Sequence, residues 1–316
     1  MNTATTVAVM PVGFFDKLRV LAAAGVAVVL IGHVGWMAVL PADPDLAITF
    51  TTSGRSLLAM WPTLLVLTMV SAAVGSAIAG PRLPEAGLLA AGVGLVGLAI
   101  RGGSMQTLLI YIADSTTADR RYLMVLMVVD TVLWAALLGV AWLVVLAVGR
   151  WLWNSQTEQP VASAGKPAPG KSKSLTDLLG GGSLALAVVA IVALLVIWMT
   201  VARTPVANIA RGQVIASVFF GLYLGAMAAR YFTGVEQVRY YLAAPPVVAV
   251  AGYLLGYLQA NMGWAKGAWA AYAALATTPP HALARPLPIE YIAVGLVGVI
   301  VGYWSGRKIE HAVVQE

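Results

Sequence analysis

Runs of about 20 apolar residues recur along the whole chain, and they constrain its fold more than any other feature. A helix needs about 20 mostly apolar residues to cross the hydrocarbon core of a bilayer. We predict about eight such helices, with a range of roughly six to eight. The predicted spans are 18–40, 56–79, 86–112, 123–149, 181–202, 213–232, 242–258 and 288–306. The sequence therefore predicts an all-α integral membrane protein, a polytopic bundle of transmembrane helices.

Two of the predicted spans are less regular than the others, and they account for the range in the count. The span at 86–112 is interrupted by Arg101, Gly102 and Gly103. The span at 242–258 is short and begins near a pair of prolines.

Composition agrees with the apolar runs and excludes several classes of protein. Hydrophobic residues make up 60% of the chain and charged residues only 10%, whereas a soluble domain is about 25% charged. Cysteine is absent, which excludes disulfides, thiolate metal sites and cysteine nucleophiles. With only three histidines, the chain offers few metal ligands, and we expect neither a metal nor a cofactor.

One segment between the fourth and fifth spans has a different composition. Residues 154–180 are rich in Pro, Gly, Ser and Lys and have no apolar periodicity, which is typical of a flexible solvated linker. This linker divides the chain into two four-helix membrane halves, 1–153 and 181–316. Two halves that start on the same side of the membrane are compatible with a parallel duplication, or with two unrelated halves.

The orientation follows from the distribution of Lys and Arg. With the N-terminus in the cytoplasm, the inner segments carry more Lys and Arg than the outer ones, and Lys166, Lys171 and Lys173 of the linker contribute most of the difference. We predict a multi-pass protein of the inner (cytoplasmic) membrane with both termini in the cytoplasm. The formal net charge of +6 then reflects contact with anionic lipid, and no nucleic-acid motif accompanies it.

Small residues at helical spacing predict close helix contacts. Lipid provides no hydrophobic drive between helices, so small residues that let backbones approach are favoured where helices associate. The glycines concerned are Gly221, Gly225, Gly252, Gly256, Gly298, Gly302 and Gly306. Two interpretations are open: contact between helices of this chain, or docking of the last span against another subunit.

Three ionisable residues lie inside predicted spans, where a charge is costly unless it is paired or hydrated. With the predicted helix ends, His33, Arg101 and Asp130 lie at a similar depth below the outer surface, and we expect Arg101 and Asp130 to neutralise each other. The cluster is interpreted either as a structural pin between helices or as a solute or proton site. A role of His33 as a haem or metal ligand is disfavoured, because no second histidine lies inside the predicted spans.

No catalytic signature accompanies this cluster. The chain lacks the nucleophile elbow, the zinc-protease helix motif and the calcium loop. We therefore predict a non-catalytic integral membrane subunit that scaffolds or anchors a larger membrane protein assembly. The alternative is a small-solute or ion transporter with a polar site near His33, Arg101 and Asp130, and a lipid-modifying enzyme is a weaker third. The expected partners are the lipid bilayer and other membrane subunits or a second copy of the chain, but not nucleic acid.

Overall fold

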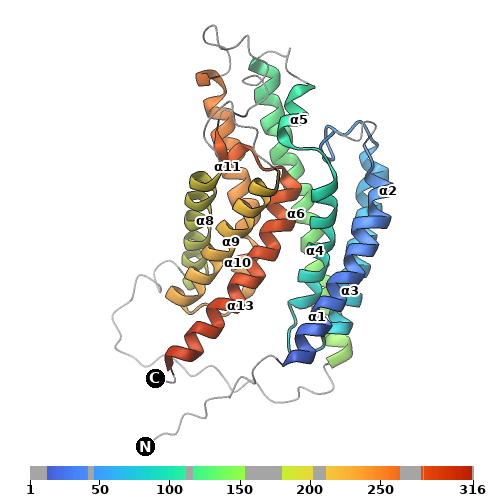
Figure 1. Cartoon of the computed structure of the whole chain (residues 1–316), viewed down its shortest axis with the longest axis vertical. Coiled ribbons are helices and arrows are strands. Elements are labelled where there is room, and N and C mark those ends of the chain that lie inside the picture. The colour runs from blue at the N-terminus through green and yellow to red at the C-terminus, as the bar shows by residue number, and fades with distance from the viewer. Residues whose placement is uncertain are drawn as a thin grey trace, which may run out of the picture.

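The computed structural model describes residues 13–41, 46–111, 117–153, 180–201, 211–263, 279 and 281–314, and these residues form helices and connecting segments without a strand. Six of the helices are long and apolar enough to cross a membrane. The protein is therefore an all-helical, multi-pass membrane protein by the length and composition of its helices. Figure 1 shows the helices side by side in an elongated bundle.

The first half of the chain contributes the helices on one side of the bundle (Figure 1). Its first helical run is continuous: α1 passes without a break through a π-helical stretch, η1, into α2. The elements are α1 (Phe14–Ala27), η1 (Val28–Gly35), α2 (Trp36–Val39), α3 (Leu57–Ala79), α4 (Ala86–Arg101), α5 (Met105–Ile110) and α6 (Thr117–Trp153).

The second half forms the other side, with one further π-helical stretch. Here η4 leads directly into α13, so the two form a single helical run. The elements are α8 (Gly181–Thr200), α9 (Arg211–Thr233), α10 (Val238–Leu242), α11 (Ala244–Gly263), the short 3₁₀ turn η3 (Ala282–Ala284), η4 (Glu290–Val294) and α13 (Gly295–Val314).

The interruption predicted at Gly102 and Gly103 ends a helix, so the single span predicted at 86–112 is wrong. Helix α4 stops at Arg101, and α5 starts at Met105 after an extended Gly102. The Gly103 N–H donates to the Leu46 carbonyl (2.9 Å) instead of to a helical carbonyl. Helix α5 is a new helix with its own cap, because the Ser104 side chain accepts a hydrogen bond from the N–H of Thr107.

The other predicted spans each overlap a helix of the structure. Six correspond to the membrane-length helices, and helix α4 at 16 residues is shorter than a typical span. The prediction at 288–306 overlaps η4 and α13, which continue eight residues beyond it. The prolines Pro245 and Pro246 lie in the first turn of α11, as expected for residues without an N–H. The exact number of membrane crossings stays a prediction.

Glycines make the closest helix contacts of the second half, and these contacts lie within the chain. Along α13, a Cβ on Gly298 would lie 2.6 Å from the Phe219 carbonyl oxygen of α9, and one on Gly302 would clash with the Tyr223 carbonyl. Gly306 meets Met227 further along. Because both series advance together, α9 and α13 run parallel with their backbones in contact.

The remaining predicted packing glycines also face elements of this chain. Gly221 and Gly225 of α9 lie against α8, where a Cβ on Gly225 would be 2.7 Å from the Val189 carbonyl oxygen. Gly252 of α11 lies against Leu283, and Gly256 lies against the side chain of Ala284. Of the two interpretations of these glycines, the structure therefore shows contact between segments of the same chain.

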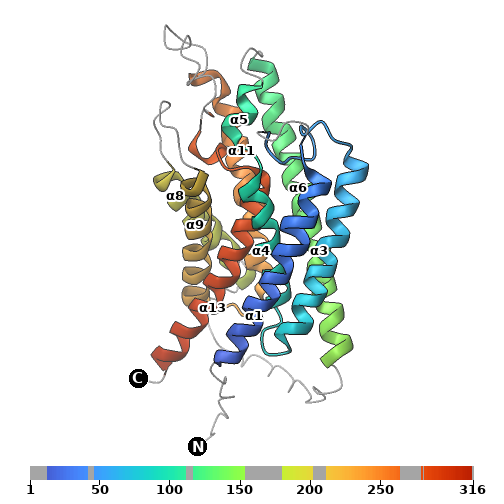
Figure 2. The ribbon, with the colours of Figure 1, turned by 45° about the vertical axis from the view of Figure 1, so that its right-hand side comes forward.

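The two halves contact each other through the middle of the bundle. Helix α11 packs on α6, and η4 and α13 pack on α4. The start of α1 and the ends of α6 and α13 lie toward the same end of the bundle, which is the lower end in Figures 1 and 2. The predicted linker at 154–180 lies outside the described residues except for Gly180.

Candidate functional site

The three residues of the predicted polar cluster have different surroundings. His33 is exposed on η1, and Arg101 is exposed at the end of α4. The Arg101 guanidinium donates to the Gly32 carbonyl (2.9 Å) and lies 5.8 Å from the centre of the Trp36 ring. The predicted ion pair between Arg101 and Asp130 is not among the ion pairs of the described residues, because each side chain has other partners.

Asp130 is fully buried in α6, and its partners are backbone amides. Its carboxylate accepts hydrogen bonds from the N–H of Phe50 (3.0 and 3.1 Å) and from the N–H of Thr51 (2.9 Å). A buried carboxylate is stable when such charge-assisted hydrogen bonds replace its hydration. Asp130 therefore fixes a non-helical segment of the chain against α6.

That segment, 46–53, is buried although it contains no helix. Ile48, Thr49, Phe50 and Ser53 are each at most 3% exposed, and the Phe50 ring packs 4.4 Å from the ring of Trp134. Non-helical backbone inside a membrane bundle needs partners from the protein, since lipid offers none. The Asp130 carboxylate and the Gly103–Leu46 hydrogen bond provide such partners.

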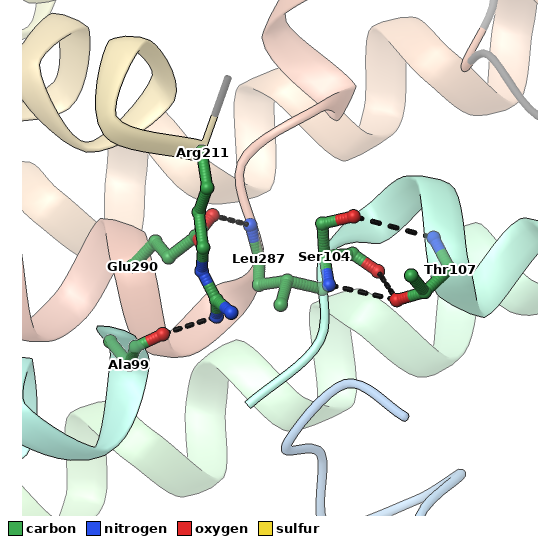
Figure 3. A network of polar contacts seen from close by, with 6 residues as sticks. All are labelled: Ala99, Ser104, Thr107, Arg211, Leu287 and Glu290. Atoms are coloured by element: carbon green, nitrogen blue, oxygen red, sulfur yellow. Dashed lines mark hydrogen bonds and ion pairs between the residues drawn. The ribbon is translucent and has the colours of Figure 1, made fainter. Parts of the chain in front are cut away.

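A second buried charge lies in the other half, between Arg211 and Glu290. The Arg211 Nε lies 3.3 Å from Glu290 Oε1, and the Glu290 side chain is only 2% exposed. Arg211 also donates to the Ala99 carbonyl of α4, so it joins the first half to the second. Figure 3 shows Arg211 between Ala99 and Glu290, with the cap of α5 nearby. This ion pair connects the starts of α9 and η4 to the end of α4.

Glu290 also fixes an irregular segment, 281–289, which contains the 3₁₀ turn η3 and leads into η4. Its second carboxylate oxygen accepts the N–H of Leu287 (2.8 Å). Two buried tyrosines hold the same segment: Tyr253 donates to the Pro286 carbonyl (2.6 Å), and Tyr291 donates to the Leu283 carbonyl (2.7 Å). Their rings are 6.0 Å apart and nearly perpendicular, an edge-to-face arrangement.

His281 begins this segment and caps it. Its Nδ1 accepts the N–H of Leu283 (3.2 Å), which requires a neutral imidazole with a free lone pair on that nitrogen. Burial lowers the pKa of His281, which favours this neutral form. His281 therefore belongs to the contacts that hold segment 281–289.

The carboxylates of Asp130 and Glu290 have the same structural role in the two halves. Asp130 holds segment 46–53, and Glu290 holds segment 281–289, each by accepting backbone N–H groups. Tyr253 donates to the same segment that Glu290 holds. We take Asp130, Arg211, Glu290 and Tyr253 as the candidate functional site, a set of buried and partly buried polar groups that anchors these two segments.

Sequence reasoning identified Asp130 as an intramembrane charge, but it did not identify the buried Glu290 or the partly buried Arg211. Both residues lie at the ends of apolar runs, where a charged residue ordinarily faces water. The prolines at 286 and 288 were the available signal, because they indicate a non-helical segment before the last helix. Its burial depends on tertiary contacts, which one sequence does not display.

The described residues contain no group of three or more His, Asp or Glu side chains positioned to hold a metal ion. Comparison with known proteins gives no relative from which a role could be transferred. No family model matches the chain, and neither a curated protein nor a solved structure matches it. The function must therefore be argued from the geometry.

Proposed function

We propose that the protein is a non-catalytic integral membrane subunit that scaffolds or anchors a larger membrane protein assembly. One observation carries the proposal: the buried carboxylates of Asp130 and Glu290 are engaged by groups of their own chain. A substrate site needs polar groups that remain available to a ligand. Groups that already hold backbone segments favour a structural role.

The outer surface of the bundle supports the same proposal. Large apolar side chains are exposed on several helices, among them Phe15 of α1 (75%), Leu143 of α6 (63%) and Met199 of α8 (69%). In a membrane these faces meet lipid or another protein. A scaffold subunit requires that at least one of them binds a protein partner.

The absence of cysteine from the natural sequence makes this proposal directly testable. Single cysteines at Phe15, Leu143 and Met199 would each carry a photo-crosslinker, and the protein would be irradiated in its native membrane. We expect one face to give a protein adduct of a single mass, while the other faces give lipid adducts. A cysteine at Val189, which is fully buried, is the matched control for unspecific adducts.

Two results would contradict the scaffold proposal. Lipid adducts alone from every exposed face would mean that no protein covers the bundle. A monomer that keeps its fold and moves solutes across reconstituted vesicles would identify a transporter instead.

Small-solute or ion transport is the second candidate, and the Arg211–Glu290 pair is the observation that favours it. The pair lies where elements of the two halves meet, and charged pairs at such places are used by transporters that rearrange their halves. Vesicles loaded with a pH-sensitive dye would report proton flux. The scaffold proposal predicts no flux above that of empty vesicles, whereas flux that Glu290→Gln abolishes would favour transport.

A further inference from the structure

A cavity of about 220 Å³ lies where the two halves meet, away from the buried polar groups. Helices α4 and α6 form one side of it, and α10, α11, η4 and α13 form the other. Its wall is mostly apolar and includes Leu88, Leu138, Trp142, Leu242 and Leu296. Arg239 of α10 is the charged residue that lines it.

The cavity has a charged end and an apolar end. Helix α10 is level with Tyr303 of α13, since the Tyr303 hydroxyl donates to the Glu236 carbonyl (2.7 Å) and its ring lies 5.2 Å from that of Tyr241. Ile292, at the opposite end of the lining, is about three helical turns earlier in the same helical run. Arg239 is thus on the side where α13 ends, and the apolar wall extends from it toward the middle of the bundle.

The positive charge of Arg239 is available to bind an anion at the charged end of the cavity. Its Nη2 donates to Gln237 Oε1 (2.9 Å) and to the Tyr240 hydroxyl (3.2 Å), which are both neutral partners. The nearby carboxylate of Glu236 pairs with Arg230 instead (3.7 Å). The Arg239 side chain is exposed, so an anion can approach it.

We propose that this cavity binds an acyl chain of an anionic phospholipid whose phosphate is held by Arg239. Water is a poor occupant, because the apolar wall offers it few hydrogen-bond partners. An empty cavity of this size would forfeit dispersion contacts around its whole lining. The lining residue Gly139 is exposed on α6, so the cavity can be reached from the surface of the bundle. A lipid chain fills apolar space, and the guanidinium favours a phosphate-bearing headgroup.

A larger side chain at Gly139 should fill the cavity without disturbing the fold. It lines the cavity, and a Cβ built on it would meet no atom within 4 Å. Leucine at this position would extend into the open space without meeting a backbone. Gly149 lies on the same helix and is equally open, but it does not line the cavity, so Gly149→Leu is the matched control.

The test is native mass spectrometry of the full chain exchanged into mixed micelles of phosphatidylglycerol and phosphatidylcholine at equal concentration. We expect the natural protein to retain phosphatidylglycerol several times more than phosphatidylcholine. Arg239→Gln should remove the preference, Gly139→Leu should reduce retention of both lipids, and Gly149→Leu should change neither. Equal retention of the two lipids by the natural protein, or full retention by Gly139→Leu, would overturn the proposal.

Discussion

Asp130 illustrates at the scale of one residue how a charge is accommodated inside an apolar bundle. Its carboxylate replaces lost hydration with hydrogen bonds from the amides of Phe50 and Thr51. The cost of burying the charge is offset only while all these bonds persist. Substitutions of Asp130 that remove a hydrogen-bond acceptor should therefore lower the stability of the protein.

Asp130→Ala should destabilise the protein strongly. It leaves two buried N–H groups without a partner, at about 1–3 kcal/mol each. Asp130→Asn keeps one carbonyl acceptor, so its stability should lie between that of the natural protein and that of Asp130→Ala. Thermal unfolding in detergent measures the difference, and exposed Arg101→Ala is the control expected to cost much less. An effect of Asp130→Ala no larger than that of Arg101→Ala would refute the anchoring role.

Arg211 and Glu290 should behave as a coupled pair, whereas Arg101 and Asp130 should not. Removing Arg211 alone leaves Glu290 buried without its cation, at a cost of about 3–5 kcal/mol. A double-mutant cycle of alanine variants should show strong non-additivity for Arg211 and Glu290. The cycle for Arg101 and Asp130 should be additive within about 0.5 kcal/mol, since they share no hydrogen-bond partner. Additivity for Arg211 and Glu290 together with strong coupling of Arg101 and Asp130 would contradict the structure and support the cluster predicted from the sequence.

At the scale of the element, the parallel contact of α9 and α13 depends on glycine. A side chain at Gly302 would meet the backbone of Tyr223, which cannot move without shifting the whole of α9. Overpacking costs about 1–3 kcal/mol where side chains can adjust, and more is expected here. Gly302→Leu should therefore lower the unfolding temperature or prevent folding.

Gly25→Leu is the matched control, because Gly25 lies exposed on α1 and a Cβ there meets nothing within 4 Å. Fluorescence-detected size exclusion would separate folded from aggregated variants. Equal tolerance at Gly302 and Gly25 would mean that α9 and α13 do not touch as the structure has them.

The helices themselves were the most predictable part of the protein. Long apolar runs determine helices in a membrane because no other single segment can satisfy its own backbone there. The break at Gly102 was visible as a glycine pair, but the burial of segment 46–53 was not. That segment is stabilised by Asp130, which is distant in the sequence. No local sequence pattern therefore predicts its burial.

The candidate site was less predictable than the fold for the same reason. Depth along a helix placed Asp130 inside the bundle, but depth alone does not say which side of a helix a residue faces. Arg101 and His33 lie at similar predicted depths and are exposed. Glu290 and Arg211 lie at helix starts, where they pair with each other, and Arg211 also contacts α4 through the Ala99 carbonyl. Sequence thus indicated one of the four site residues as an intramembrane charge.

At the scale of the whole molecule, the arrangement predicts that both ends of the described chain share one side of the membrane. The start of α1 and the end of α13 lie toward the same end of the bundle (Figure 1). We expect tags placed before Phe14 and after Val314 to be protected together in right-side-out vesicles and cleaved together in inverted ones. Opposite protection of the two tags would require an odd number of crossings.

The scaffold proposal depends on Asp130 anchoring the buried segment 46–53 instead of facing a hydrated site. The most direct measurement is the reaction of single cysteines with a water-soluble maleimide, in a chain that otherwise has none. Ser53 is 1% exposed and Ser56 is exposed, so Ser53→Cys and Ser56→Cys form a matched pair. We predict that the cysteine at 56 reacts and the one at 53 does not, until Asp130→Ala releases the segment. Reaction at 53 as fast as at 56, with Asp130 intact, would contradict the account.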